Sequence, residues 1–190
     1  ALVTRTPYVL WGHGPSGDSR SRRPKDYAEI PIVRGARHVI TYLPGGKDSL
    51  VATTGSSPDR VTPYMNSTDT AELLHARSRL TPADHQATRD DLGIDDASLV
   101  ALYVGAFDTS KRVDLLVEMA ERASALDSRF RLILAGRGPD EDKVKALAAS
   151  NPSVMWMGYA DRDLLAALAA ISHAMVIPGR VGLVAVDALA

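Results

Sequence analysis

The sequence predicts an α/β fold in which parallel sheets form two lobes. Short apolar runs alternate with segments of helical period through most of the 190 residues. From residue 98 onward this alternation becomes regular, and four strand–helix units follow one another. Consecutive units of this kind, joined by right-handed crossovers, build an open sheet of parallel strands. Because ligands of such sheets bind beyond the carboxyl ends of the strands, a site is expected in the loops that follow the strands.

The first part of the chain holds three candidate strands. The runs 8–14 and 38–44 are apolar, and a helix is expected over 46–53. The run 60–66 is a weaker strand, because Pro63 lacks an amide donor and suits the edge or the end of a sheet. The polar and basic stretch between the first two runs indicates a loop or the start of a helix.

The middle of the chain has no strand signal and contains two helix-like pieces. Thr81 is expected to cap the second piece, with Pro82 at the first helical position and Asp84 at the third, as in a capping box. This segment is interpreted as a connector between two lobes. The predicted domains are a first lobe over 1–70, a helical connector over 71–97 and a second lobe over 98–190.

The second lobe begins with residues 99–105, a nearly continuous apolar run typical of a strand covered on both faces. Apolar residues then repeat at helical spacing after Lys111, at Val113, Leu116, Val117 and Ala120. Three further strands are expected at "RLILA", "VMWMG" and "AMVIP". The helices that follow them are expected at "DEDKVKALAAS", "DRDLLAALAAIS" and "VGLVAVDALA".

The charge balance bears on the partners. Lys and Arg number 22 against 23 Asp and Glu, so there is no excess of positive charge of the kind that non-specific nucleic-acid binding requires. We therefore expect no nucleic-acid partner. The basic stretch at Arg20, Arg22, Arg23 and Lys25 is either a solvated loop or a contact for an anionic substrate or a membrane surface.

The absence of cysteine removes disulfides, thiolate zinc sites and a cysteine nucleophile together, and it fits a reducing compartment. No apolar run approaches the roughly 20 residues that span a bilayer, so no transmembrane segment is expected. Nothing at the N-terminus resembles a signal peptide. These observations predict a soluble, cytoplasmic protein, with at most peripheral contact with a membrane.

One motif suggests a dinucleotide. The stretch "GHGPSG" (12–17) matches G-x-G-x-x-G directly after a strand. Its context does not fit, because Pro15 and the residues after it do not open a helix, and the next strand ends without an acid for a ribose. NAD binding is therefore the less favoured interpretation. The sequence contains neither a Walker A motif nor the G-x-S-x-G motif of serine hydrolases.

Three residues are candidates for a site by position. Lys111 lies at a helix start, where a cation is unfavourable, so it either holds a phosphate together with free amide groups or is a solvated lysine. Asp187, in the last helix, either accepts hydrogen bonds from a ribose diol or is a surface acid. His13, at a strand end, either acts as an acid or base near neutral pH or is structural.

The order of these segments carries more information than each alone. "LYVGAFDTSKRVDLLVEMA", "FRLILAGRGPDEDKVKALA", "VMWMGY" and "VIPGRVGLVAVDALA" resemble the donor-binding lobe of family-4 glycosyltransferases. "VLWGHG" and "HVITYLPGGKDSLVATTGSSPDRVTPYMNSTDT" are similar to the later half of the acceptor lobe. The resemblance covers nearly the whole chain. It implies the GT-B fold of two facing Rossmann-like lobes, both expected to be incomplete here.

The resemblance also implies a donor site in the second lobe. Lys111 matches the family's lysine that contacts the diphosphate of a nucleotide sugar, and Asp187 matches the second of two glutamates, which holds the ribose hydroxyls. The backbone amides around Gly182 would face the sugar or the phosphate. Gly105 ends the strand that precedes the phosphate loop, and Tyr159 would lie near the base.

Two departures from the family pattern stand out. The arginine that usually follows the strand glycine is replaced by Ala106 or Phe107, so half of the phosphate clamp is missing. Counting back eight positions from Asp187 reaches Gly179, so the first glutamate is also absent. This absence affects the usual contact with the donor sugar.

The function implied by the resemblance is a glycosyltransferase, of the retaining kind, that moves a sugar from a nucleotide-diphosphate sugar to a carbohydrate or lipid acceptor. His13 would be its catalytic group from the acceptor lobe. Lys111 and helix amides would stabilise the departing diphosphate without a metal ion or other cofactor. Because a complete enzyme of this fold needs about twice this length, we expect little or no transferase activity from the isolated chain. The alternatives are a non-catalytic nucleotide-sugar-binding module, an NAD-dependent oxidoreductase and a purely structural lobe.

Overall fold

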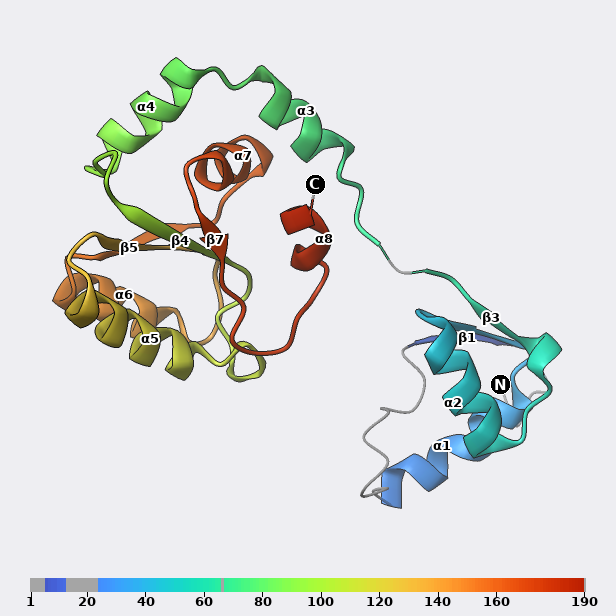
Figure 1. Cartoon of the computed structure of the whole chain (residues 1–190). Helices are drawn as coiled ribbons and strands as arrows, with labels where there is room; N and C mark the ends of the chain where they lie inside the picture. The colour runs from blue at the N-terminus through green and yellow to red at the C-terminus, as the bar shows by residue number, and fades with distance from the viewer. Residues whose placement is uncertain (1–5, 13–23, 66, 190) are drawn as a thin grey trace. The chain divides into compact units, whose positions relative to one another are not determined.

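The computed structural model describes residues 6–12, 24–65 and 67–189 (Figure 1). The chain divides into two compact units, Ala1–Ser67 and Thr68–Ala190. Each unit is built around a sheet in which all paired strands are parallel. The predicted α/β class with parallel sheets is confirmed.

The sheet of the first unit has the order β1-β2-β3. Its strands are β1 (Val9–Gly12), β2 (His38–Thr41) and β3 (Val61–Pro63). Its helices are α1 (Pro24–Gly35), α2 (Pro44–Thr54) and a 3₁₀ turn (Pro58–Arg60). β3 lies at an edge, as Pro63 predicted, because a proline cannot donate to a second neighbour. Ala36, Val39, Leu50 and Val61 form the buried core.

The sheet of the second unit has the order β6-β5-β4-β7. Its strands are β4 (Leu99–Val104), β5 (Phe130–Ala135), β6 (Val154–Gly158) and β7 (Ala174–Met175). Its helices are α3 (Ala71–Arg79), α4 (Pro82–Asp91), α5 (Val113–Leu126), α6 (Glu141–Ser150), α7 (Arg162–Ala170) and α8 (Val184–Leu189). All four strand–helix units expected after residue 98 are present.

Helices cover both faces of this second sheet, with α5 and α6 on one face and α3 and α7 on the other (Figure 1). The side chains of β4 alternate accordingly. Val100 and Leu102 join the core on the α3 and α7 side, whereas Ala101 and Tyr103 join the core on the α5 and α6 side. This double coverage explains why the strand has an almost continuous apolar sequence.

The segment expected as a connector is helical and packs on the second unit. Leu73 and Ala76 of α3 are buried in the core that α7 shares, and α3 is part of the second unit. The capping box of α4 is confirmed. The Thr81 side chain accepts a hydrogen bond from the Asp84 amide, and the Thr81 amide donates to the Asp84 carboxylate. In the part of the chain that is described, the helices fall short of the length and apolarity that crossing a membrane requires.

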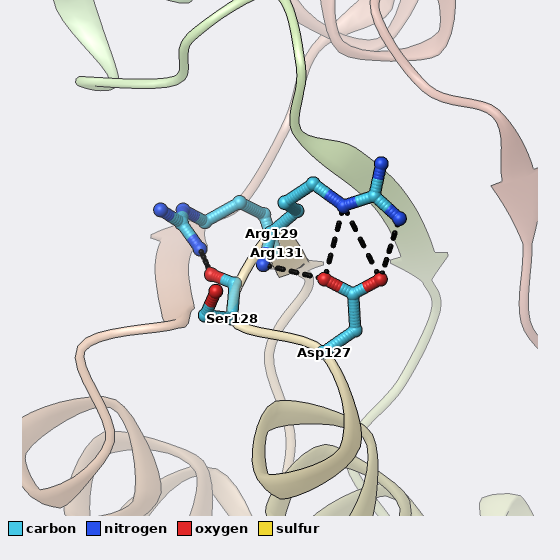
Figure 2. Close-up of polar contacts among 4 residues, drawn as sticks. All are labelled: Asp127, Ser128, Arg129 and Arg131. Carbon is cyan, nitrogen blue, oxygen red and sulfur yellow. Dashed lines mark hydrogen bonds and ion pairs between the residues drawn. The ribbon is translucent and has the colours of Figure 1, made fainter.

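The turn between α5 and β5 is fixed by one carboxylate (Figure 2). Asp127 accepts hydrogen bonds from the Arg129 amide at 2.8 Å and from the Arg129 guanidinium, the shortest at 2.7 Å. Arg131 donates to the Ser128 carbonyl at 2.8 Å. Hydrogen bonds from the Arg129 side chain and amide lower the pKa of Asp127 from 3.8 to about 2. The chain therefore enters β5 through a turn that depends on an ionised Asp127.

Replacing Asp127 by asparagine is expected to lower the free energy of unfolding near neutral pH, by a modest amount because the pair is partly exposed to water. The folded-state pKa lies below the unfolded value, so the stabilisation is present above about pH 4 and is lost as the pH falls towards about 2. Urea unfolding of the wild type and the variant across this pH range measures the difference in their free energies of unfolding. Asp96→Asn serves as a control for the loss of one negative charge. A difference in unfolding free energy that does not change with pH would contradict the role given to the ionised Asp127.

Candidate functional site

The candidate site lies where the strand order of the second sheet changes direction. β5 and β6 extend from one side of β4, and β7 pairs with the other side. At such a point the connections after two neighbouring strands, here β4 and β7, run in opposite directions and leave room for a ligand. These loops are residues 105–112, after β4, and residues 176–183, after β7.

The two loops contact each other through Arg180. Its amide donates a hydrogen bond to the Ser110 carbonyl at 2.8 Å, and its carbonyl accepts one from Lys111 Nζ at 2.7 Å. The lysine ammonium is therefore held against the loop after β7. Within the described part of the chain, Lys111 takes part in none of the salt bridges.

Lys111 ends a 3₁₀ turn (Thr109–Lys111), and Arg112 takes a left-handed conformation (φ 55°, ψ 53°) before α5 begins. Two amides of this turn, those of Ser110 and Lys111, are already occupied rather than free for a phosphate. Asp108 Oδ1 accepts from the amides of Ser110 at 2.8 Å and Lys111 at 3.2 Å. Hydrogen bonding by Ser110, with a smaller effect of the Lys111 amide and charge, lowers the pKa of Asp108. The turn therefore offers the Lys111 ammonium rather than its amides.

Glycines permit the close packing of the two loops. A Cβ atom on Gly179 would lie 2.5 Å from the Ser110 carbonyl oxygen and 2.6 Å from Lys111 Cα, which are fixed backbone atoms. A Cβ atom on Gly182 would lie 3.3 Å from Lys111 Nζ, at the mobile end of a side chain. Gly179 is the position where the family resemblance calls for a glutamate. With the loop on this path, no side chain of any kind fits there.

Asp187 is tied to the start of α7. Its Oδ1 accepts a hydrogen bond from Arg162 Nη1 at 3.3 Å, and its side chain is only 13 % exposed. It also lines a cavity of about 340 Å³ beside α3, α7 and β7. Among the described residues, Asp187 is bonded to Arg162 and Lys111 to Arg180, and no hydrogen bond or ion pair joins Asp187 to Lys111.

Gly105 lies where β4 ends and closely approaches the end of β5. A side chain on Gly136 would overlap the Gly105 carbonyl, and the Gly136 amide donates to the Gly158 carbonyl at 2.6 Å. The strand ends thus come together at glycines. Tyr159 follows Gly158 and is 67 % exposed, with a ring that is free to meet a planar ligand.

Phe107, one of the two residues at the place of the family's clamp arginine, is part of the core. It is fully buried and stacks on Tyr103 with ring centroids 5.7 Å apart. Tyr103 donates its hydroxyl to the Ala106 carbonyl at 2.7 Å, and burial raises the pKa of Tyr103 to about 12. The loop after β4 is thereby fixed by aromatic packing, and a charged side chain could not replace Phe107 without breaking it.

The remaining candidates fall outside the described residues. His13 lies there, together with most of the "GHGPSG" stretch and with Arg20, Arg22 and Arg23. Among the residues that are described, no three or more His, Asp or Glu side chains gather in a way that could hold a metal ion.

The family of the chain is shown by its sequence. Residues 84–190 match the model of the family described as glycosyl transferases group 1. This match covers 107 of the 190 residues, and the chain belongs to that family. A search among curated proteins found no match.

Solved structures agree on the fold. HepE of Anabaena in complex with UDP-glucose aligns with a TM-score of 0.70 and 17 % identity, over 99 % of this chain and 52 % of that one. WaaG, a glycosyltransferase involved in lipopolysaccharide biosynthesis, aligns with a TM-score of 0.68 and 15 % identity, over 97 % and 55 %. TarM of S. aureus aligns with a TM-score of 0.63 and 15 % identity, over 93 % and 33 %. The chain spans about half the length of the HepE structure, and the predicted GT-B-like class, with two Rossmann-like parallel sheets, is confirmed.

Sequence reasoning assigned no role to Arg162 or Arg180. Arg180 stands in the loop after the fourth strand of the second lobe, within "GRVG", and that position alone marked it for inspection. Arg162 opens a helix after the third strand of that lobe, and nothing in the sequence pairs it with Asp187, 25 residues away. The contacts of Arg162 and Arg180 became visible only in the three-dimensional structure.

Gly179→Ala is expected to destabilise the second unit by about 1–3 kcal/mol, because the new methyl group meets backbone atoms that cannot move independently. Gly182→Ala is the matched control, since the lysine end can shift away from its methyl group. Urea unfolding of the three proteins gives the comparison. Equal stability of Gly179→Ala and the wild type would show that the two loops are not packed in this way.

Proposed function

We propose that the second unit binds the nucleoside diphosphate part of a nucleotide sugar, and that the protein is a retaining glycosyltransferase of the family-4 type. One observation carries the proposal. In a chain of the glycosyl transferases group 1 family, the Lys111 ammonium lies at the switch point of the second sheet. Within the described ranges, its one hydrogen-bond partner is a neutral carbonyl.

In this proposal a phosphate oxygen replaces the Arg180 carbonyl as the acceptor of Lys111. A hydrogen bond between an ammonium and a phosphate is charge-assisted and stronger than one to a neutral carbonyl. Because Gly182 has no side chain beside Nζ, the ligand can approach the ammonium from that side. As the bond to the sugar breaks, negative charge grows on the diphosphate, and the fixed ammonium stabilises it. In this proposal Lys111 supplies the positive charge that stabilises the diphosphate, and no metal ion or other cofactor takes part.

Asp187 is proposed to hold the ribose hydroxyls. Arg162 occupies Oδ1 and fixes the orientation of the carboxylate, while Oδ2 accepts no hydrogen bond from the described residues. Tyr159 is proposed to lie near the base, and Gly105 to let the chain turn sharply below the phosphates. His13, from the first unit, is proposed as the catalytic group.

The acceptor is proposed to be a carbohydrate or a lipid. The WaaG structure is described as that of an enzyme of lipopolysaccharide biosynthesis, and TarM was solved with UDP and a GlcNAc-glycerol compound. HepE was solved with UDP and with UDP-glucose, which makes uridine the first base to test. The cysteine-free sequence is in keeping with a reaction in the cytoplasm, with peripheral contact to a membrane where the acceptor is a lipid.

A non-catalytic nucleotide-sugar-binding module is the second candidate, and Gly179 is the observation that favours it. The position of the first family glutamate has no side chain here and no room for one, so the usual contact to the donor sugar is missing. Such a module would bind the nucleotide part as described above but would not transfer the sugar. Release of nucleoside diphosphate from the nucleotide sugar in the presence of acceptor separates the two.

Calorimetric titration of UDP, GDP, ADP and NAD into the chain tests the proposed site. One nucleoside diphosphate is expected to bind, and Lys111→Ala and Asp187→Asn are each expected to weaken it about tenfold, as for the loss of a hydrogen bond to a charged group. Asp187→Asn keeps the size of the side chain that Arg162 contacts. Lys143→Ala, which removes an exposed lysine on α6, is the matched control. Failure of all three diphosphates to bind, or unchanged binding in both variants, would contradict the proposal.

A further inference from the structure

Arg180 has a main chain that is fixed at the candidate site from both sides. Its amide is bonded to Ser110, and its carbonyl is bonded to Lys111 Nζ, so its Cα cannot leave the Lys111 loop without breaking both bonds. Gly179, directly before it, is packed against the same loop. The start of the Arg180 side chain is therefore anchored next to the lysine ammonium.

The side chain of Arg180 is exposed, and its guanidinium makes no hydrogen bond or salt bridge with the described residues. Two cations, Lys111 and Arg180, are thus attached to one small piece of backbone. The two acids that flank these loops, Asp108 and Asp187, make their hydrogen bonds to other groups. Asp108 accepts the amides of its own turn, and Asp187 is bonded to Arg162.

Where the two side-chain cations come close to each other, they repel each other unless an anion lies between them or near both. A group with two adjacent negative centres satisfies both cations at once. A diphosphate is such a group, and a guanidinium can bind its oxygens through two parallel hydrogen bonds. A single phosphate could satisfy one cation fully and the other only in part.

We propose that Arg180 supplies the second positive charge of the diphosphate site, from the loop after β7 rather than from the loop after β4. This inference rests on the proposed function. Arg180 would replace the family's usual arginine, whose place is taken here by Ala106 or Phe107. The Phe107 ring is buried in the core. The charge missing from one loop is provided by the other loop, which the fold holds against Lys111.

The test compares UDP with UMP, titrated into the wild type and into Arg180→Ala, Arg180→Lys and Arg137→Ala. Arg137 is the matched control, because it is an exposed arginine in the loop after β5 whose main chain, not its side chain, is used in packing. Arg180→Ala is expected to weaken UDP about tenfold and UMP clearly less, as for the loss of a charge-assisted hydrogen bond to the second phosphate. Arg180→Lys is expected to retain most of the UDP affinity, and Arg137→Ala all of it.

The possible outcomes distinguish a failure of the Arg180 inference from a failure of the proposed function. If Lys111→Ala weakens UDP but Arg180→Ala binds it like the wild type, this inference is wrong and the proposed function remains. If Arg180→Ala weakens UDP and UMP equally, Arg180 does not read the second phosphate, and the inference is also wrong. If the wild type binds none of UDP, GDP and ADP, the proposed function fails and this inference fails with it. Equal urea midpoints of the wild type and all the variants, Lys111→Ala included, confirm that the variants are folded.

Discussion

The position of the Lys111 ammonium depends on a main-chain contact between the loops after β4 and β7. That contact exists because β4 and β7 are neighbours in the sheet, although some 70 residues separate them in the chain. Its closeness requires a residue without a side chain at Gly179. The strand order, the glycine and the lysine therefore form one unit, and none of the three explains the site without the other two.

The same contact determines which charges remain for a ligand. The carboxylates near the loops are committed to local bonds, Asp108 to the amides of its own turn and Asp187 to Arg162. The two cations on the contact, Lys111 and Arg180, have no salt bridge among the described residues. The contact between the two loops thus carries a local excess of positive charge. This is the electrostatic environment that an anionic leaving group requires.

Much of the fold follows from local patterns in the sequence. The apolar run that became β4, the capping box of α4 and the edge position of β3 each depend on neighbouring residues only, and each was predictable. The packing of α3 on α7 was not, because its buried residues Leu73 and Ala76 meet partners about 90 residues away.

The candidate site, too, was predictable only where it depends on local sequence. Lys111 and Gly182 could be chosen from their places after strands, and the structure brings them together. The bonding of Asp108 to its own turn, the link from Arg162 to Asp187 and the fit of Gly179 depend on distances that no sequence spacing gives. The departure from the family pattern at Gly179 was visible in the sequence, but its steric reason was not.

Hydrogen–deuterium exchange of the backbone amides, with and without saturating UDP, tests the central claim most directly. The account predicts slower exchange on nucleotide addition in two separate peptides, one covering residues 108–112 and the other covering residues 179–187. Protection confined to other segments, such as α3 and α4, would contradict the assignment of the diphosphate site to Lys111 and the loop after β7.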